Sequence, residues 1–342
     1  MFAYIIKRIL LMVPTLFGVL TITFVIAQFV PGGPVEQLIA QMRERSLVSG
    51  TRGGHDLDPK RIEQLKALYG FDKPPVERYV LMLKNFLRFD FGKSFSASRD
   101  VWDVIKSKLG VTLSLGAWSF LVIYLISIPL GVAKAVREGS RFDVATTLLV
   151  LVGFAIPGFV LGVLLIVLFA GGSFLDWFPV RGLFSDNWST LSWPARITDY
   201  LWHLTLPLIC LTIGSFATLT VLTKNTFVEE MRKQYVLVVR AKGLSERAVL
   251  YKHIFRNALL PIITGLPAAV VGVIFGGSLL IEQLFSLDGM GRLSYDSVIR
   301  RDYPVVLATA YLYTLLGLVA RLLSDLAYVA ADPRIQFGSA AR

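Results

Sequence analysis

Six long apolar runs without a formally charged residue dominate this sequence of 342 residues. The hydrocarbon core of a bilayer is about 30 Å thick and requires roughly 20 apolar residues in a helix. Each run meets or nearly meets that length. The runs are Ile9–Val35, Leu109–Ala133, Val144–Leu175, Tyr200–Thr223, Asn257–Ile281 and Tyr303–Ala320. The sequence therefore predicts an all-α membrane protein with six transmembrane helices.

The basic residues of the short connections predict how these helices are oriented. Lysine and arginine concentrate in the cytoplasmic loops of membrane proteins. They are abundant before the first run, between the second and third runs, and between the fourth and fifth. We therefore expect both termini and the connection 224–257 to be cytoplasmic. This bias also explains the net charge of +11, so we expect no nucleic-acid partner.

The predicted spans divide the chain into four regions. Residues 1–35 hold the first helix, 36–108 form a periplasmic segment with short amphipathic helices, 109–330 form a five-helix core, and 331–342 form a cytoplasmic tail. Within the periplasmic segment, Asp58–Gly70 and Val76–Phe89 have the spacing of amphipathic helices. They hold too few apolar residues for a core of their own. We expect them to lie on the membrane surface or on a partner subunit.

Prolines and small residues punctuate the spans. A proline is tolerated inside a bilayer helix when neighbouring helices satisfy the carbonyl that it frees. Ordinary tight packing explains such residues as well as a hinge or a pore does. As candidates for a translocation path we take Phe154, Pro157, Gly158, Pro207 and Ser215. The spans hold no carboxylate near their middles, so we expect a neutral passage without fixed charge.

Motifs for independent energy coupling or catalysis are missing from the sequence. It contains no G-x-x-x-x-G-K-[ST] phosphate-binding motif, so we expect no ATP hydrolysis, no catalytic residue and no cofactor on this chain. The single Cys210 and three histidines show no metal-ligand spacing. His203 and Cys210 lie seven residues apart on one predicted helix, which leaves a weak soft-metal site open. The remaining classes are a passive conduit, a receptor, or a transport subunit driven by a partner.

The connection between the fourth and fifth runs has the most specific local sequence. Lys224–Val239 is expected to continue the fourth helix beyond the membrane, and Gly243 allows a break in it. Ser245 is placed to cap a second helix, on which Val249 and Ile254 form part of an apolar edge. A helix with such an edge and basic flanks suits a lipid surface, a solvated loop or a docking partner.

Two segments of this connection, Arg240–Leu244 and Arg256–Pro261, resemble the ATPase-coupling segment of ABC importer permeases of the dipeptide/oligopeptide/nickel group. The triplet Leu237–Val239 departs from the more polar or alanine-rich triplet of related permeases. The resemblance assigns the coupling role to Arg240, Ala241, Lys242, Gly243, Leu244, His253, Arg256 and Asn257.

The same resemblance extends along the whole chain. It includes Lys7–Leu11, Leu68–Pro74, Asp288–Leu293 and Asp332–Ile335. The insertion around Met42–Asp58 and the sequence Gly32–Glu36 resemble the microcin C/peptide permease branch of the group.

The resemblance implies the type I ABC importer permease fold and a location in the bacterial inner membrane. It also implies four kinds of partner: a second homologous permease, ATPase subunits that bind ATP and Mg²⁺, a periplasmic or lipid-anchored solute-binding protein, and the lipid bilayer. The expected function is ATP-driven import of short peptides or peptide-like compounds. A permease of the same fold for nickel or another small solute, and a non-ABC membrane channel or scaffold, stay open as alternatives.

Overall fold

The structure is a computed structural model that describes residues 2–29, 72–172, 174–275 and 277–331. Most of these residues are helical, and among them the β pairing is limited to an isolated bridge between Lys93 and Asp100. The helix predicted at Asp58–Gly70 and the insertion 42–58 lie outside the described residues. The chain divides into two compact units, one formed by 1–5, 109–292 and 317–342, the other by 6–108 and 293–316.

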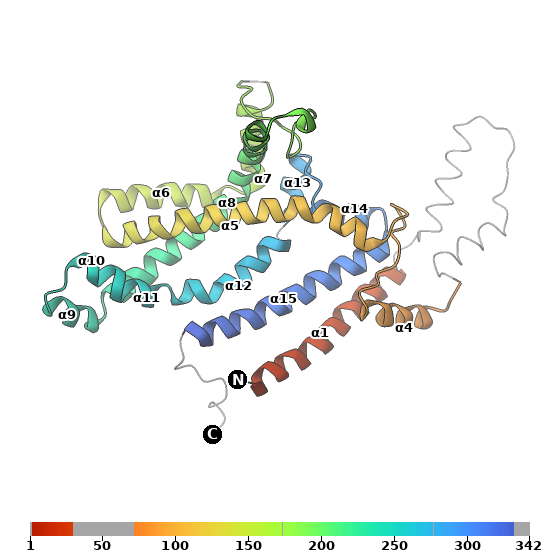
Figure 1. Ribbon diagram of the computed structural model, residues 1–342, viewed down its shortest axis with the longest axis horizontal. Helices are drawn as coiled ribbons and strands as arrows, with labels where there is room; N and C mark the ends of the chain where they lie inside the picture. The colour runs from red at the N-terminus through yellow and green to blue at the C-terminus, as the bar shows by residue number, and fades with distance from the viewer. Residues whose placement is uncertain (1, 30–71, 173, 276, 332–342) are drawn as a thin grey trace. The chain divides into compact units, whose positions relative to one another are not determined.

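Four helices of the described part are long and apolar enough to cross a membrane, and Figure 1 labels each of them. They are α1 (Phe2–Phe29), α5 (Val101–Val136), α8 (Trp193–Met231) and α15 (Tyr303–Ala331). Two bent helix pairs raise the number of candidate spans to six if each pair is one span. The prediction of an all-α membrane protein is confirmed, although two of the six expected helices are broken.

The third predicted span, Val144–Leu175, is not one helix. It consists of α6 (Arg141–Ala155) and α7 (Gly158–Phe169), which meet at an angle of 95°. Between them, Ile156 has extended backbone angles and precedes Pro157. A proline clashes with a helical conformation of the residue before it, so the chain leaves the helix at Ile156 and re-enters it after Pro157.

The fifth predicted span, Asn257–Ile281, is also divided. It begins in α11 (Phe255–Ala258) and continues as α12 (Leu260–Phe275), which ends six residues earlier than expected. The bend between the segments Glu246–Ala258 and Leu260–Gly272 is 51°. A separate short helix, α13 (Leu279–Leu284), follows an extended Ser278, and α14 (Met290–Ile299) comes next. The charged Glu282, which marks the end of the apolar run in the sequence, thus lies inside a folded segment.

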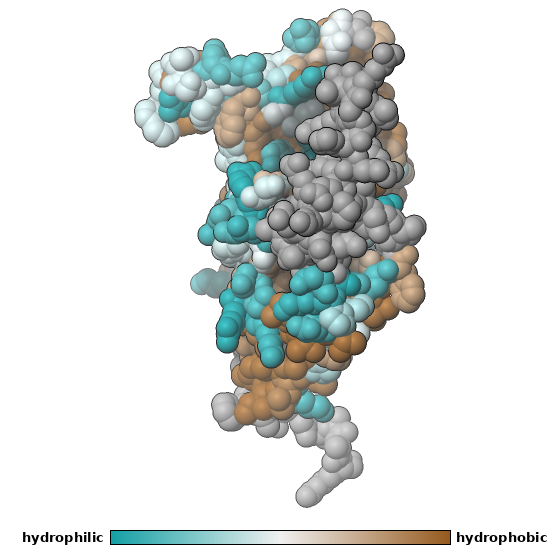
Figure 2. Space-filling view, turned by 90° about the vertical axis from the view of Figure 1, so that its right-hand side faces the viewer, coloured by the Kyte–Doolittle hydropathy of each residue, from teal (hydrophilic) through white to brown (hydrophobic). Residues whose placement is uncertain are grey.

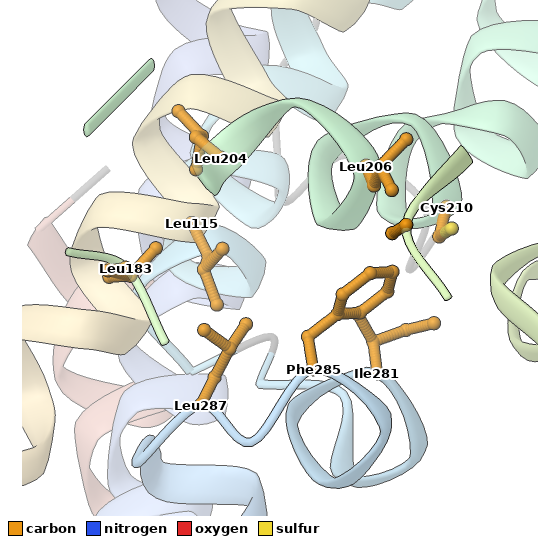
Figure 3. Packing of buried hydrophobic residues seen from close by; sticks show 9 residues of the cluster. Leu115, Leu183, Leu204, Leu206, Cys210, Ile281, Phe285 and Leu287 are labelled. Atoms are coloured by element: carbon orange, nitrogen blue, oxygen red, sulfur yellow. The ribbon is translucent and has the colours of Figure 1, made fainter. Parts of the chain in front are cut away.

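In the first unit, α8 packs closely against its neighbours at glycines. A Cβ atom at Gly131 of α5 would lie 2.5 Å from the Thr223 Cβ, and one at Gly158 would lie 2.5 Å from the Cys210 carbonyl oxygen. Small residues allow such backbone approach between membrane helices. Figure 3 shows the adjoining apolar cluster, in which side chains of α5 and α8 meet Ile281, Phe285 and Leu287 from the α13 region.

In the second unit, Asp302 lies directly before α15 and binds the segment that follows α4 (Pro75–Phe86) through hydrogen bonds. Its fully buried carboxylate accepts hydrogen bonds from the amides of Phe95 and Ser96, each at 3.0 Å, and from the hydroxyls of Ser94 and Ser96. Helix α4 confirms the amphipathic helix predicted at Val76–Phe89, with an earlier end.

Much of the helical surface is apolar and uncovered within this chain. Figure 2 shows broad hydrophobic areas beside polar ones on one face of the molecule. Large aliphatic side chains such as Leu10, Leu125 and Leu149 are exposed. A water-soluble protein exposes few contiguous apolar areas of this kind, whereas helices in lipid or against a partner subunit do so routinely.

We predict that Gly131→Ala destabilises the protein. The added methyl would overlap Thr223 and lie 2.9 Å from the Thr220 carbonyl oxygen. Overpacking of this kind typically costs about 1–3 kcal/mol. The measurement is the unfolding temperature of the purified protein in detergent. The matched control is Gly110→Ala in the same helix, where no described atom lies within 4 Å of the new methyl. Equal unfolding temperatures for the two variants would contradict the packing argument.

Candidate functional site

The loop 224–257 begins within α8 and contains a break between α8 and the next helix. We expected a continuous helix over Lys224–Val239, but α8 ends at Met231 and a second helix, α9, spans Gln234–Ala241. Lys233 has extended backbone angles at the break. The buried Glu230 carboxylate binds the Lys233 ammonium and accepts a hydrogen bond from the Tyr235 hydroxyl at 2.8 Å. These contacts on both sides of the break hold α9 at a fixed angle to α8.

Gly243 ends α9 in the way that its sequence position predicted. Its φ of +79° lies in the left-handed region, which costs other residues a clash with their Cβ atom. Its amide donates a hydrogen bond to the Arg240 carbonyl at 2.9 Å. Ser245 then caps α10 (Glu246–Ala248) by accepting from the Ala248 amide, as predicted.

The second half of the loop 224–257 contains a π-helical turn, which is wider than a turn of α-helix. Residues Val249–Ile254 form a π-helical turn that contains His253 and leads into α11. Such turns are rare and occur frequently at functional sites. The His253 carbonyl accepts a hydrogen bond from the Tyr235 hydroxyl at 3.5 Å, and Asn257 donates one to the same hydroxyl at 3.3 Å. Burial raises the pKa of this hydroxyl.

An apolar core holds both halves of the loop against the ends of α5 and α8. Phe227 of α8 is fully buried and meets Phe255 in an edge-to-face contact at 5.5 Å. Val236, Val249 and Ile254 are buried in the same core. Fully burying one large aliphatic side chain contributes about 1.5–3 kcal/mol. The loop is therefore a rigid extension of the helices rather than a loose connection.

The surface of this loop combines basic and aliphatic side chains. Leu237 is 63% exposed, Val238 55% and Tyr251 62%. Six of the eight residues assigned a coupling role are exposed, while Leu244 and His253 are half-buried. The six are Arg240, Ala241, Lys242, Gly243, Arg256 and Asn257. The loop thus offers a firm, partly apolar surface that suits a protein partner.

A buried ion cluster lies where α5, α6 and α8 meet next to this loop. The Asp143 carboxylate lies 3.2 Å from the Lys134 ammonium and 2.6 Å from that of Lys224. Lys134 is almost fully buried and also donates to the hydroxyls of Thr146 and Thr147. Removing Asp143 from this cluster leaves both ammonium groups without their counter-charge. The cluster was not predicted from sequence, because its members lie on three different helices and Lys224 is 81 residues from Asp143.

A cavity of about 650 Å³ lies between α5, α6, α8, α12 and α13. A second cavity of about 470 Å³ shares part of its wall. Of the predicted path residues, Phe154 and Ser215 line both cavities, and Pro157 and Gly158 line the second. Pro207 is buried inside α8 and is not among the residues lining either cavity.

Among its described lining residues, the larger cavity has one carboxyl group, that of Glu282, which lies directly beyond the fifth predicted span. Glu282 was not predicted as a site residue, because a charge directly after an apolar run usually marks the end of a span. The signal that identifies it is its glycine-rich surroundings: Gly277, Gly289 and Gly291 flank it in the sequence.

The two residues of the weak soft-metal hypothesis have different surroundings on α8. The His203 Nδ1 atom lies 2.9 Å from the Asp199 carbonyl oxygen, while Cys210 packs against apolar residues of the cluster in Figure 3. Among the described residues, no three His, Cys, Asp or Glu side chains converge on one point.

Residues 127–337 match the protein family described as "binding-protein-dependent transport system inner membrane component". The chain is 52% identical to the peptidoglycan transport system permease protein YejB of Agrobacterium fabrum, over 98% of each chain. It is 50% identical to the inner membrane ABC transporter permease protein YejB of Escherichia coli O157:H7, over 98% of this chain and 99% of the relative. It is 35% identical to the oligopeptide transport system permease protein AppB of Bacillus subtilis, over 98% of this chain and all of the relative.

We predict that Gly243→Pro abolishes transport while the protein still inserts into the membrane. Proline fixes φ near −65° and has no amide hydrogen, whereas Gly243 needs a φ of +79° and donates to Arg240. The measurement is uptake at matched membrane abundance. Gly243→Ala serves as the milder control, because it keeps the amide and meets only the left-handed strain. Normal uptake by the proline variant would show that the geometry of this turn does not matter.

Proposed function

We propose that this chain, which belongs to the family of binding-protein-dependent transport system inner membrane components, carries short peptides or peptide-like compounds across the membrane. The chain is the permease subunit of an ABC importer and a multi-pass inner membrane protein. It is a transport subunit and not itself an enzyme. The observation that carries the choice of cargo is its high identity, over nearly the full length, to permeases named for peptidoglycan and oligopeptide transport.

The proposed complex contains a second homologous permease, ATPase subunits that bind ATP and Mg²⁺, and a periplasmic or lipid-anchored solute-binding protein. In this arrangement both termini and the loop 224–257 face the cytoplasm. The loop docks on an ATPase subunit through exposed aliphatic side chains such as Leu237 and Val238, with its basic residues around them. Its rigid core supports this role, because a docking surface transmits movement only if it does not deform separately from the helices.

The proposed mechanism is alternating access. Closure of the ATPase subunits on ATP moves the loop, and the loop moves α8, to which it is joined through the core around Phe227. Helix α8 also lines the larger cavity with Gly214, Ser215 and Thr218. A shift of α8 therefore changes the cavity wall directly. Hydrolysis returns the loop and the helix to the inward-facing arrangement.

The proposed cargo is tested by uptake in reconstituted complexes that contain all partner subunits. Radiolabelled di- to tetrapeptides and radiolabelled nickel are supplied in parallel, with and without ATP. We expect ATP-dependent accumulation of peptide and none of nickel. The matched control is a complex whose ATPase subunits carry an inactive nucleotide site. ATP-dependent nickel uptake without peptide uptake would replace the proposal by the metal alternative, and assembly without any ATPase subunit would favour a channel or scaffold.

The orientation is tested by labelling single cysteines in intact cells, with Cys210 replaced by alanine. We expect Ser189→Cys to react with a membrane-impermeant maleimide and Lys252→Cys to react only after the cells are opened. Both side chains are exposed, so a difference in reactivity reports the side of the membrane and not burial. Reaction of Lys252→Cys in intact cells would overturn both the orientation and the docking role of the loop.

A further inference from the structure

Among the described residues, two ion pairs join the hairpin of α5 and α6 to the end of α8. One is buried: the Asp143 carboxylate of α6 lies 2.6 Å from the Lys224 ammonium. The other is exposed: the Glu138 carboxylate, in the turn between α5 and α6, lies 3.1 Å from the Arg232 guanidinium directly after α8. Water and salt weaken an exposed pair, whereas a buried pair is screened much less. The two pairs therefore differ in how firmly they hold the helices.

Lys134 of α5 extends the buried pair to a cluster of three charges. Its ammonium lies 3.2 Å from the Asp143 carboxylate and donates to the Asp143 carbonyl at 3.0 Å. It also donates to the hydroxyls of Thr146 at 2.8 Å and Thr147 at 2.7 Å. Lys134 thus fixes the start of α6 to α5, and Lys224 joins both helices to α8 through the same carboxylate.

Toward its other end, α6 meets α8 through apolar contact. A Cβ atom at Gly153 would lie 2.9 Å from the Ile213 Cδ1 atom, so the backbone of α6 lies directly against that side chain. Gly153 comes after Asp143 along α6. Its neighbour Ile213 comes before Lys224 along α8, so the two helices run antiparallel. Apolar attraction has no preferred direction, whereas a charge-assisted hydrogen bond fixes the distance between two atoms. The Asp143–Lys224 pair therefore sets the position of α6 along α8.

The end of α6 forms part of the cavity walls. Phe154, one residue before the end of this helix, lines both cavities. Asp143 lies in the first turn of the same unbroken helix. Because the helix is stiff over this length, a displacement of its start is passed on to Phe154.

We propose that Lys224 is a positioning residue for transport: by holding Asp143, it makes α6 and the ring of Phe154 follow the displacements of α8. The inference rests on the proposed function, in which the loop 224–257 moves α8. It adds a second connection between that loop and the cavity, through α6 as well as through α8 itself. Without the pair, α8 moves while α6 stays behind, so ATP is hydrolysed with less transport.

Lys224 can be replaced without leaving a charge unpaired. Two ammonium groups face one carboxylate, so Lys224→Met still leaves Asp143 paired with Lys134. The Lys224 side chain is 20% exposed, against 1% for Lys134, so a longer cationic side chain has room at this position. Lys224→Arg keeps the positive charge and can form two parallel hydrogen bonds with a carboxylate. It is therefore the conservative variant.

The first measurement is the amount of radiolabelled tri-alanine transported per ATP hydrolysed, in reconstituted complexes that contain all partner subunits. We expect Lys224→Met to lower this ratio about tenfold or more, because a hydrogen bond between charged groups shifts an equilibrium by about that factor. ATP hydrolysis per complex should stay near the wild-type rate, and Lys224→Arg should restore most of the ratio. A merely structural role would reduce transport and hydrolysis together and leave the ratio unchanged.

The matched control is Glu138→Gln, which breaks the exposed ion pair between the same elements. It should leave the ratio of transport to hydrolysis at the wild-type value.

The second measurement does not depend on the cargo. Spin labels are attached at Val144→Cys on α6 and Leu201→Cys on α8, with Cys210 replaced by alanine. Both side chains are exposed, and the line between them runs along the antiparallel helices, so their distance reports sliding of α6 along α8. Double electron–electron resonance should give the same distance in the wild type without nucleotide and with ATP and vanadate. Lys224→Met should give different distances in these two states.

The proposal is overturned by an unchanged transport ratio in Lys224→Met, by equal loss in Glu138→Gln, or by the absence of rescue in Lys224→Arg. It is also overturned by a wild-type distance that changes between the two states, or by a Lys224→Met distance that does not. The wild-type distances need no variant at position 224, so they decide the matter if Lys224→Met does not assemble. A wild type that moves no peptide but shows the expected distances refutes only the proposed cargo. Peptide transport with an unchanged ratio refutes the positioning role alone.

Discussion

Packing against α8 is the constraint on which most of the first unit depends. At one end, Leu204, Leu206 and Cys210 join the apolar cluster that holds α13, and at the other end Phe227 joins the core of the loop 224–257. At a rise of about 1.5 Å per residue, its 39 residues span about 58 Å, well beyond the hydrocarbon core of a bilayer. One stiff element therefore connects the loop to the cavity, and neither can shift far without the other.

At the starts of α6 and α14, side chains of the same unit accept hydrogen bonds from backbone amides of the first turn. These amides have no partner within their own helix. At the start of α6, the Ser140 hydroxyl accepts from the Asp143 amide, while Asp143 binds Lys134 and Lys224. After α12, the Glu282 carboxyl accepts from the Arg292 amide. The buried carboxyl groups of Asp143 and Glu282 therefore hold the starts of these two helices in place.

The sequence was sufficient for the helical class, the approximate helix positions and the turn at Gly243, because each of these depends on local pattern. It was not sufficient for the 95° bend at Pro157. Prolines Pro14, Pro129 and Pro207 lie inside unbroken helices, so proline alone does not distinguish a kink from a break. At this break Gly158 packs against the Cys210 carbonyl of α8, a contact that the local sequence does not specify. The contacts of Asp143 and Glu282 were not predicted either, because their partners lie on other helices or are backbone atoms.

The two candidate sites differ in how far the sequence alone identifies them. The loop 224–257 is one continuous segment, so its sequence alone pointed to a coupling role through resemblance. The larger cavity takes its wall from five helices, and its residues are mostly small or apolar. A wall of this kind admits many compounds, because apolar contact discriminates weakly between similar ligands. Selectivity in such a cavity depends on the few polar side chains of its wall, such as the hydroxyls of Ser119, Ser215 and Thr218.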